Sequence, residues 1–157
     1  MNNSVTTLSR REFLRSSSVL GFAVLSGGAI EVLHGNTVAE GVDGVPVNAW
    51  VSIMKSGDVI INVSATEMGQ GVMTSLPMIV AEELDADWTN VQIQQIDEGP
   101  ADVYGNPRIG GLLFTAGSLS VEGYFDLLRR AGANARRVLI YSAAAQWSVP
   151  VTEVTSE

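Results

Sequence analysis

Cysteine is missing from this 157-residue chain, and histidine occurs once, as His34. Without a thiol the chain cannot form a disulfide, hold zinc or an iron–sulfur cluster through thiolates, or use a cysteine nucleophile. A single imidazole cannot build a multi-histidine metal site, and a Ser-His-Asp triad would have to depend on His34. These absences exclude most familiar hydrolase and metalloenzyme sites, and we predict no metal ligands among this chain's side chains.

Positive charge is also scarce in the chain. There are 9 Lys+Arg residues against 17 Asp+Glu, which gives a formal net charge of −8. Nucleic acid is therefore not an expected partner, because phosphate contacts require clustered basic residues. Charged residues make up 17% and hydrophobic residues 46%, a composition typical of a folded chain. The length suffices for one modest core rather than for two ordinary domains.

The N-terminal apolar run is too short to span a membrane. Residues 16–30 are small, apolar and uncharged, but a span needs about 20 predominantly apolar residues. The adjacent Arg10 and Arg11 precede this run, and the arrangement resembles the bacterial twin-arginine export signal. We therefore predict export by the twin-arginine route and a periplasmic location. An amphipathic N-terminal helix is the alternative, which the glycines of this segment disfavour.

The predicted signal sets the organisation of the chain. It covers residues 1–39, with cleavage expected after Ala39, and it removes His34 with it. Residues 40–46 are expected to form a linker, and residues 47–157 the mature domain. Because the twin-arginine route carries proteins that fold before crossing the membrane, usually around a cofactor, the signal indicates a cofactor loaded in the cytoplasm.

Hydrophobic periodicity predicts an α+β fold for the mature part. Alternating runs predict strands, and apolar residues three and four positions apart predict helices. The predicted strands cover 47–54, 59–65 and 91–96, and the predicted helices cover 72–84 and 118–147. The clean alternation over 91–96 predicts that this strand is half-buried. We also expect a break or kink at Pro77, a polar loop over 97–111 and the start of another strand over 149–154. This order favours a small mixed sheet with helices packed on one face.

Two glycine-rich loops, residues 67–71 and 110–120, precede the two predicted helices. A helix N-terminus offers unpaired N–H groups and the positive end of the helix dipole, which together favour an anion such as phosphate. Glycines allow a flat ligand to come close to the backbone. Gln70 lies between two of them, and its neutral amide can donate to an oxyanion or metal-oxo group without adding charge.

Each of these features also has a plainer interpretation. Ser118 and Ser120 can donate to phosphate, or they can simply cap the second helix. Gln70 can be an ordinary turn residue, and Glu67 is expected on the loop surface. Neither loop matches the GxGxxG dinucleotide pattern or the GK[ST] phosphate loop, so nucleotide sites of those two kinds are not indicated.

The first loop and the helix after it resemble a known family. Residues 66–74 read TEMGQGVMT, and residues 81–84 read AEEL. This combination resembles the molybdopterin-binding region of the xanthine dehydrogenase/aldehyde oxidase family. Residues 46–154 are similar to the N-terminal part of its large (β) subunits, in the branch of the isoquinoline 1-oxidoreductases and exported aldehyde dehydrogenases. The resemblance implies that residues 47–157 are a truncated part of a larger molybdopterin-binding domain.

The resemblance also assigns a role to each loop position. Gln70 matches the catalytic glutamine whose side-chain amide points at an oxo ligand of molybdenum. Cofactor contacts are implied for positions in both loops. These positions are Gly69, Gln70, Gly71, Thr115, Ala116, Gly117, Ser118 and Ser120. Ala116 and Leu119 depart from the usual family sequence of the second loop.

The reaction, cofactors and partners follow from the same resemblance. The intact enzyme would hydroxylate N-heteroaromatic rings or aldehydes oxidatively, with a molybdenum–molybdopterin cofactor in its cytosine dinucleotide form. Electrons would leave through Fe–S clusters on a small [2Fe-2S] partner subunit, with a cytochrome as a candidate acceptor. The absence of cysteine from this chain agrees with that division of labour.

The family's large subunits are several hundred residues longer than this chain. Their general-base glutamate lies near the C-terminus in a Gly-x-Gly-Glu setting, and no such motif occurs here. We therefore expect a fragment whose activity belongs to the intact protein, completed by the rest of the large subunit. Two alternatives stay open: a non-catalytic module that binds the cofactor or docks to a partner subunit, and a remnant that folds poorly.

Overall fold

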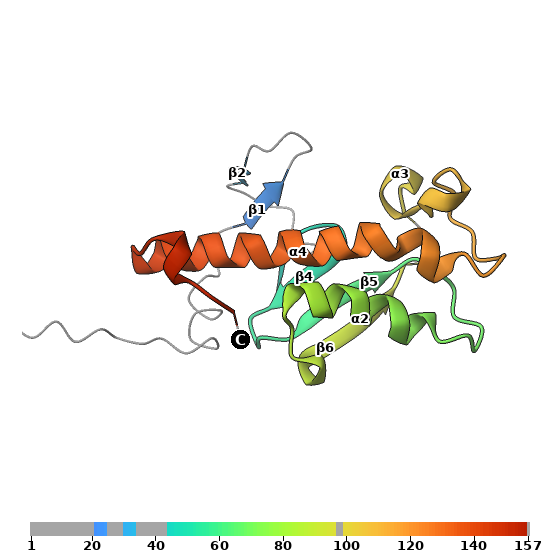
Figure 1. Cartoon of the computed structure of the whole chain (residues 1–157), viewed down its shortest axis with the longest axis horizontal. Helices are drawn as coiled ribbons and strands as arrows, with labels where there is room; N and C mark the ends of the chain where they lie inside the picture. The colour runs from blue at the N-terminus through green and yellow to red at the C-terminus, as the bar shows by residue number, and fades with distance from the viewer. Residues whose placement is uncertain (1–20, 25–29, 34–43, 97–98, 157) are drawn as a thin grey trace, which may run out of the picture.

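The computed structural model describes residues 21–24, 30–33, 44–96 and 99–156. The arginine pair and the expected cleavage site of the predicted export signal lie outside these residues. The main folded unit consists of one sheet and two long helices (Figure 1). Among the described residues, none of the helices combines the length and the apolar character needed to cross a membrane.

The first described segments form an antiparallel pair. Strand β1 (Gly21–Val24) pairs with β2 (Ile30–Leu33), with Gly21 opposite Leu33. Both strands fall within the span predicted as an export signal, and His34, which follows β2, lies outside the described residues.

The main sheet has four strands in the order β3-β4-β5-β6. They are β3 (Gly44–Pro46), β4 (Val51–Met54), β5 (Val59–Val63) and β6 (Val91–Gln95). The first three are antiparallel neighbours, whereas β6 runs parallel to β5. The predicted mixed sheet is therefore confirmed.

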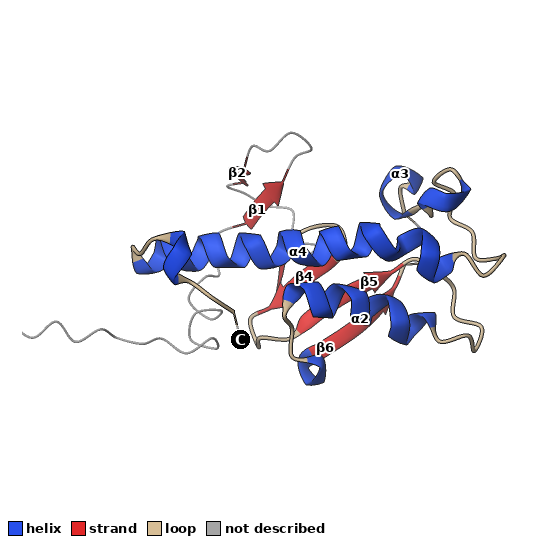
Figure 2. Ribbon diagram, viewed as in Figure 1, coloured by secondary structure: helices blue, strands red, loops and turns tan. Residues whose placement is uncertain are grey.

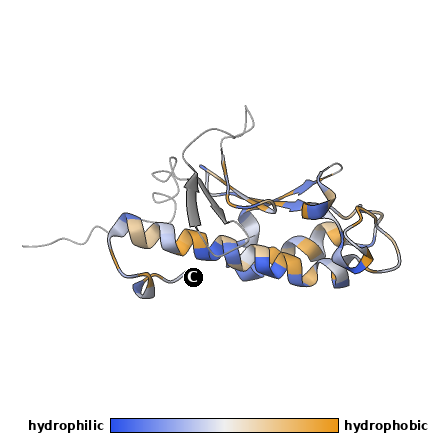
Figure 3. Ribbon diagram, turned by 90° about the horizontal axis from the view of Figure 1, so that it is seen from above, coloured by the Kyte–Doolittle hydropathy of each residue, from blue (hydrophilic) through white to orange (hydrophobic). Residues whose placement is uncertain are grey.

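The two long helices cover one face of this sheet. Helix α2 (Val72–Leu84) connects β5 to β6, because parallel neighbours cannot be joined by a tight hairpin. Helix α4 (Ser120–Trp147) lies beside α2 on the same face, as Figure 2 shows. Seen from above, the strands form one layer and the helices the other (Figure 3). This two-layer arrangement confirms the predicted α+β fold.

The hydrophobic core lies between the sheet and the helices. Val51 and Ile61 are fully buried on the helix-covered side of the sheet. Leu76 and Val80 of α2 and Leu128 of α4 are buried in the same core. Full burial of such a side chain stabilises the fold by about 1.5–3 kcal/mol. The helical spacing seen in the sequence therefore identifies the faces that pack.

Helices α2 and α4 approach closely at Gly132. A Cβ atom at this position would stand 2.5 Å from the carbonyl oxygen of Val80, so only glycine permits the contact. Arg129 of α4 forms an ion pair with Glu83 of α2 along the same contact. Backbone proximity therefore sets the spacing of the two helices.

Helix α2 is continuous through Pro77, where we expected a kink or local break. Proline removes one helix hydrogen bond, but the ring of Pro77 is among the fully buried side chains of the molecule. Packing of the ring offsets the lost bond, and the prediction of a break was wrong.

The entry into the sheet also differs from the prediction. Residues 44–46, assigned to a linker, form β3, and residues 47–50, assigned to a strand, form a turn. The Oδ1 atom of Asn48 accepts the N–H groups of Trp50 and Val51 at 2.9 and 3.0 Å. Such an asparagine turn reverses the chain between two antiparallel strands.

The last described segment is helical where a strand was expected. Residues 149–154 contain the 3-10 helix η3 (Val151–Glu153). Pro150 directly precedes it and has no N–H to donate to a sheet. The Nε atom of Arg136 donates to Ser156 Oγ at 2.7 Å and holds this segment against α4.

Short helical turns lie before and after β6 in the sequence. The predicted polar loop contains α3 (Ala101–Tyr104) and η2 (Pro107–Ile109), and η1 (Trp88–Asn90) precedes β6. We expected β6 to be half-buried, but Ile93 is 36% exposed. The reason is topological, since β6 is the edge strand of the sheet.

Candidate functional site

Both glycine-rich loops lie at the same end of the molecule. Residues 64–71, which include the first loop, join β5 to α2, and residues 110–119 lead into α4 (Figure 1). The backbone N–H of Thr66 donates to Thr115 Oγ1 at 2.9 Å, which joins the two loops across 49 positions of sequence. The structure therefore brings together the two segments that the sequence assigns to one cofactor.

The first loop leaves its backbone accessible at Gly69 and Gly71. Their φ angles of +92° and +87° lie in the left-handed region, which residues with a side chain rarely adopt. A Cβ atom placed on either residue would meet nothing within 4 Å. This open space is what close approach of a flat ligand to the backbone requires.

Gln70 is exposed, but its side chain is folded back onto its own loop. Its Nε2 donates to the carbonyl oxygen of Thr66 at 2.7 Å, and its Oε1 accepts the N–H of Met68 at 2.6 Å. Both ends of the amide are thus held within the loop. Nε2 carries two N–H bonds, so its second N–H can donate to a ligand while the first stays with Thr66, and both become available when the amide rotates away.

Glu67 closes the N-terminus of α2. Its Oε1 accepts the N–H groups of Gly69 and Gly71 at 2.7 and 3.0 Å, and its Oε2 accepts that of Met73 at 3.0 Å. These backbone hydrogen bonds, the one from Met73 first, hold the pKa of Glu67 below its ordinary value, and desolvation opposes them only in part.

The position of Glu67 corrects one expectation about the first loop. The helix N-terminus that was predicted to attract an external anion already carries the chain's own carboxylate. Glu67 is exposed as expected, yet it organises the loop. The sequence signal was weak, because a side chain this far before the helix start lies outside the usual capping positions.

The N-terminus of α4 is open by comparison. Its N-cap residue is Leu119, which provides no side-chain cap, and Ser118 lies before it with φ +58°. Ser120 is already the first helical residue, so neither serine is the cap that the plainer interpretation proposed. Glu122 in the first turn is neutralised by an ion pair with Arg108. This helix start therefore matches the predicted anion site better than that of α2.

The predicted contact positions of the second loop are accessible to different degrees. Three of them are exposed, and two are partly buried. The exposed ones are Ala116, Gly117 and Ser118, and the partly buried ones are Thr115 and Ser120. The hydroxyl of Thr115 accepts from Thr66 and keeps its own proton available for donation.

Asn106 is buried and holds the second loop in shape. Its Nδ2 donates to the carbonyl oxygen of Leu119 at 3.0 Å, and its Oδ1 accepts the N–H of Arg108 at 2.9 Å. Its backbone N–H donates to Leu112 O at 2.9 Å. The sequence analysis missed this residue, although asparagine before Pro107 is a turn signal.

An aromatic cluster supports both loops from the core. Ser64 Oγ, just before the first loop, donates to the carbonyl oxygen of Tyr104 at 2.9 Å, and Tyr124 Oη donates to the same oxygen at 2.9 Å. The ring of Trp50 contacts both tyrosines edge to face. Burial raises the pKa of the Tyr124 phenol, with the Ser64 hydrogen bond opposing it.

Apolar side chains are exposed within the two loops. Met68 of the first loop is 68% exposed, and Phe114 of the second is 62% exposed. Leu112 and Leu113 precede Phe114 and are also exposed. Both loops therefore present large apolar side chains to their surroundings.

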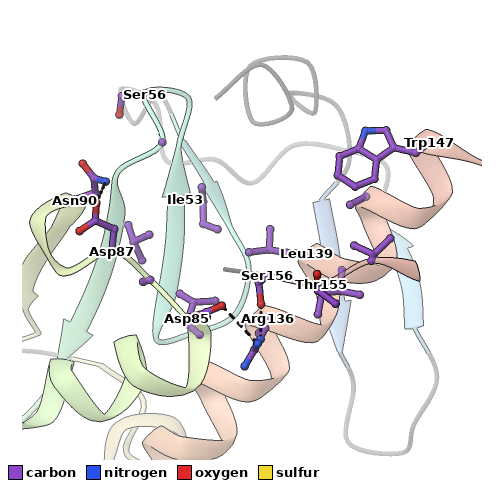
Figure 4. Close-up of a pocket in the computed structure, with 17 residues that line it drawn as sticks. Ile53, Ser56, Asp85, Asp87, Asn90, Arg136, Leu139, Trp147, Thr155 and Ser156 are labelled. Carbon is purple, nitrogen blue, oxygen red and sulfur yellow. Dashed lines mark hydrogen bonds and ion pairs between the residues drawn. The ribbon is translucent and has the colours of Figure 1, made fainter. Parts of the chain in front are cut away.

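A separate pocket of about 320 Å³ lies at the other end of the sheet. The β4–β5 turn, the end of α2 and the last turns of α4 line it. Arg136 reaches Asp85 at 3.5 Å and Ser156 at 2.7 Å there, and Trp147 lies across the cavity (Figure 4). Within the described ranges, acidic and histidine side chains do not gather into a group able to hold a metal ion.

Comparison with known proteins agrees with the site. The molybdopterin cofactor-binding domain family matches residues 16–157. The β subunit of isoquinoline 1-oxidoreductase from Brevundimonas diminuta is 44% identical over 153 residues, which is 96% of this chain and 19% of that protein. A membrane-bound aldehyde dehydrogenase (pyrroloquinoline-quinone) from Gluconacetobacter polyoxogenes is 34% identical over 143 residues, or 88% of this chain and 17% of that protein.

The chain thus spans about a fifth of the length of these curated relatives. The family match includes both glycine-rich loops and the whole main sheet. It confirms the resemblance drawn from residues 66–74 and 81–84. This chain belongs to the molybdopterin cofactor-binding domain family, within the xanthine dehydrogenase group of proteins.

Proposed function

We propose that this chain forms the part of a molybdenum hydroxylase large subunit that receives the pterin cofactor between its two glycine-rich loops. The observation that carries the proposal is the hydrogen bond from Thr66 to Thr115, which holds both loops at one place. The family match of residues 16–157 supports the choice of cofactor.

The residues present fit such a group. The open space over Gly69 and Gly71 admits a flat ring system, and the open N-terminus of α4 suits its phosphate groups. When bound, the molybdenum cofactor supplies the two-electron chemistry that oxidative hydroxylation requires. The chain itself binds and orients the cofactor.

The loop residues have distinct proposed roles. Gln70 donates from Nε2 toward the reacting end of the cofactor, and its neutrality adds no charge there. Thr115, Ser118 and Ser120 supply hydroxyl donors, and Ala116 and Gly117 keep the second loop thin. One N–H of Gln70 Nε2 is bonded to Thr66, so donation uses the second N–H, or both once the side chain rotates.

The proposal extends to the complete enzyme. Its substrates are N-heteroaromatic compounds or aldehydes, and its cofactor is the cytosine dinucleotide form. A small [2Fe-2S] subunit takes the electrons, and a cytochrome receives them in turn. The name of one relative as a subunit β supports the existence of partner subunits. The catalytic glutamate and the substrate pocket come from the rest of the large subunit.

Export of the protein is part of the same proposal. Residues 1–39 act as a twin-arginine signal, residues 40–43 link it to the domain, and the domain, whose first strand β3 begins at Gly44, enters the periplasm folded. The membrane-bound relative supports an exported enzyme. Loading of the cofactor before export explains the choice of this route.

A docking module without catalysis is the second candidate. The exposed Met68 and Phe114 favour it, because they offer apolar surface to another chain. In this case the chain binds the cofactor or a partner subunit, and another protein performs the reaction.

The native protein can distinguish the two candidates. We would isolate it from the periplasm of its host with an antibody to residues 47–157, then measure its size, its molybdenum content by mass spectrometry and its pterin by fluorescence. A band far above 16.6 kDa that carries molybdenum supports the hydroxylase. A band near the size of the mature chain without molybdenum contradicts it and favours the docking module.

A further inference from the structure

The first loop is held by two sets of hydrogen bonds of different character. Glu67 binds only backbone N–H groups, those of Gly69, Gly71 and Met73, through both of its oxygens. Gln70 is bound through its neutral amide to Thr66 and Met68. The carboxylate of Glu67 therefore holds the main chain of the loop in place. The amide of Gln70 holds only its own side chain against the loop.

These two sets differ in strength. Hydrogen bonds to a charged acceptor are roughly twice as strong as those between neutral groups. Three of them converge on one carboxylate, and the positive end of α2 adds to their attraction. Both sets are exposed to water, so the difference lies in charge and number: the two hydrogen bonds of Gln70 are neutral, and water replaces them more easily. The backbone of the loop should therefore persist while the amide of Gln70 rotates outward.

We propose that Glu67 is a positioning residue, which holds the loop backbone rigid so that the Gln70 amide alone swings between its stored place and the cofactor. The movement of the Gln70 amide toward the cofactor rests on the proposed function. The hydrogen bonding of the loop backbone by Glu67 does not. The carboxylate also closes the N-terminus of α2, which leaves the N-terminus of α4 as the place for the cofactor's phosphates.

The hydrogen bonds from the loop backbone to Glu67 predict that the signals of the bonded amides depend on pH in the wild-type chain. Nuclear magnetic resonance of the full ¹⁵N-labelled chain would follow the backbone amides of Gly69, Gly71 and Met73 as pH falls. We expect the three signals to shift together, at a midpoint below that of an ordinary glutamate, because they report one carboxylate of lowered pKa. Independent or absent shifts would overturn the proposal without any variant being made.

A neutral variant separates the two oxygens of the carboxylate. In Glu67→Gln the remaining carbonyl oxygen can still accept from Gly69 and Gly71, but the new amide group faces the N–H of Met73 and cannot accept from it. We expect several-fold faster hydrogen exchange at Met73 and smaller changes at the two glycines. The matched control is Glu153→Gln, since Glu153 is exposed in η3, and this variant should leave all three amides unchanged.

The mobility of Gln70 is tested in the same sample. We expect the side-chain amide protons of Gln70 to exchange several-fold faster than the backbone amide of Gly71, since only the latter is held by the carboxylate. Equal protection of the two groups, or an unchanged Met73 amide in Glu67→Gln, would show that Glu67 does not divide the loop in this way.

The cofactor provides a separate readout in the native protein. If the wild-type protein contains no molybdenum while the amide results hold, the proposed function fails and the role of Glu67 in the loop stands. If molybdenum is present, we expect Glu67→Gln to lower the molybdenum content per chain several-fold and Glu153→Gln to leave it unchanged. Equal contents in wild type and Glu67→Gln would overturn the positioning role toward the cofactor.

Discussion

Gly123 of α4 lies directly against the side chain of Asn106. A Cβ atom at position 123 would stand 2.6 Å from Asn106 Cγ and 2.7 Å from its Nδ2. That same Nδ2 donates to Leu119 O at 3.0 Å, immediately before α4 begins. The missing side chain at position 123 therefore lets a buried amide reach the second loop and fix the start of the helix.

Replacement of Gly123 by alanine should destabilise the fold. The added methyl group pushes Asn106 from its place, and overpacking of this kind costs about 1–3 kcal/mol. Urea unfolding followed by circular dichroism measures the loss. Asn134→Ala in the exposed part of the same helix is the control, with an expected change within about 0.5 kcal/mol. Equal stability of the two variants would contradict the close contact.

A double-variant cycle tests whether the two residues act on each other. Asn106→Ala alone removes two hydrogen bonds and should cost about 1–3 kcal/mol. It also removes the atoms that the new methyl group would meet. The combined variant should therefore lose less stability than the sum of the single losses. Simple additivity would show that the contact does not cause the destabilisation.

Thr115→Val should remove the hydrogen bond between the two loops while it preserves the shape of the side chain. The variant lacks the oxygen that accepts the N–H of Thr66. Because this bond is exposed, water replaces it, and we expect a stability loss of only about 0.5–1.5 kcal/mol. The amide of Thr66 should exchange several-fold faster with deuterium.

Two further variants serve as controls for this experiment. Thr115→Ser keeps the hydroxyl and should retain the slow exchange at Thr66. Thr152→Val changes an exposed threonine far along the chain and should alter nothing. If valine at position 115 left the Thr66 amide as slow as before, the bond would not join the loops in solution.

Alkaline pH should destabilise the fold through Tyr124. Its folded-state pKa is raised above the ordinary value near 10, chiefly by burial, so the folded state holds the phenol proton more tightly than the unfolded state does. This contribution is complete below the ordinary pKa and is lost as pH rises through the raised pKa.

Unfolding measured from pH 8 to 12 would reveal this dependence. The free energy of unfolding should fall less steeply above about pH 10 in Tyr124→Phe than in wild type. Tyr141→Phe, at an exposed position of the same helix, should keep the wild-type slope. Parallel curves for wild type and Tyr124→Phe would rule out a raised pKa at this tyrosine.

Gln70→Ala tests the proposed donor in the intact native enzyme. Removal of one donor from a comparable oxyanion site costs about 2.7–4 kcal/mol in transition-state stabilisation, or roughly 100- to 1000-fold in turnover. Molybdenum content should stay near the wild-type value, because the backbone contacts of the loop persist. Unchanged turnover in a variant that retains its molybdenum would exclude Gln70 from the reaction.

Local pattern was sufficient for the two long helices and for strands β4, β5 and β6, and insufficient where side chains direct the backbone. The period of apolar residues predicted α2 and the long helix α4, because one face of each must be buried. The same reasoning extended a strand across residues 47–50, where the amide of Asn48 turns the chain instead. It also assigned half-burial to β6, since an edge position is not visible in the alternation of its residues.

The same distinction applies to the candidate site, where local features were visible in the sequence and contacts between distant segments were not. Glycines at 69 and 71 around Gln70 were evident from the sequence, because residues that lack a side chain and a lone amide between them are local features. Their meeting with Thr115 depends on a contact between distant segments. Glu67 and Asn106 were missed, since a carboxylate or amide reveals its role only when the N–H groups around it are in place.

The sequence by itself determined the two long helices, the strands β4, β5 and β6, the two glycine-rich loops and the family to which they belong, because these depend on residue type and spacing. Only the tertiary structure decided which helix N-terminus stays open. The carboxylate of Glu67 reaches the start of α2, whereas Leu119 leaves that of α4 uncapped. The physical reason is that hydrogen bonds depend on direction and distance in space, which the order of residues along a chain does not specify.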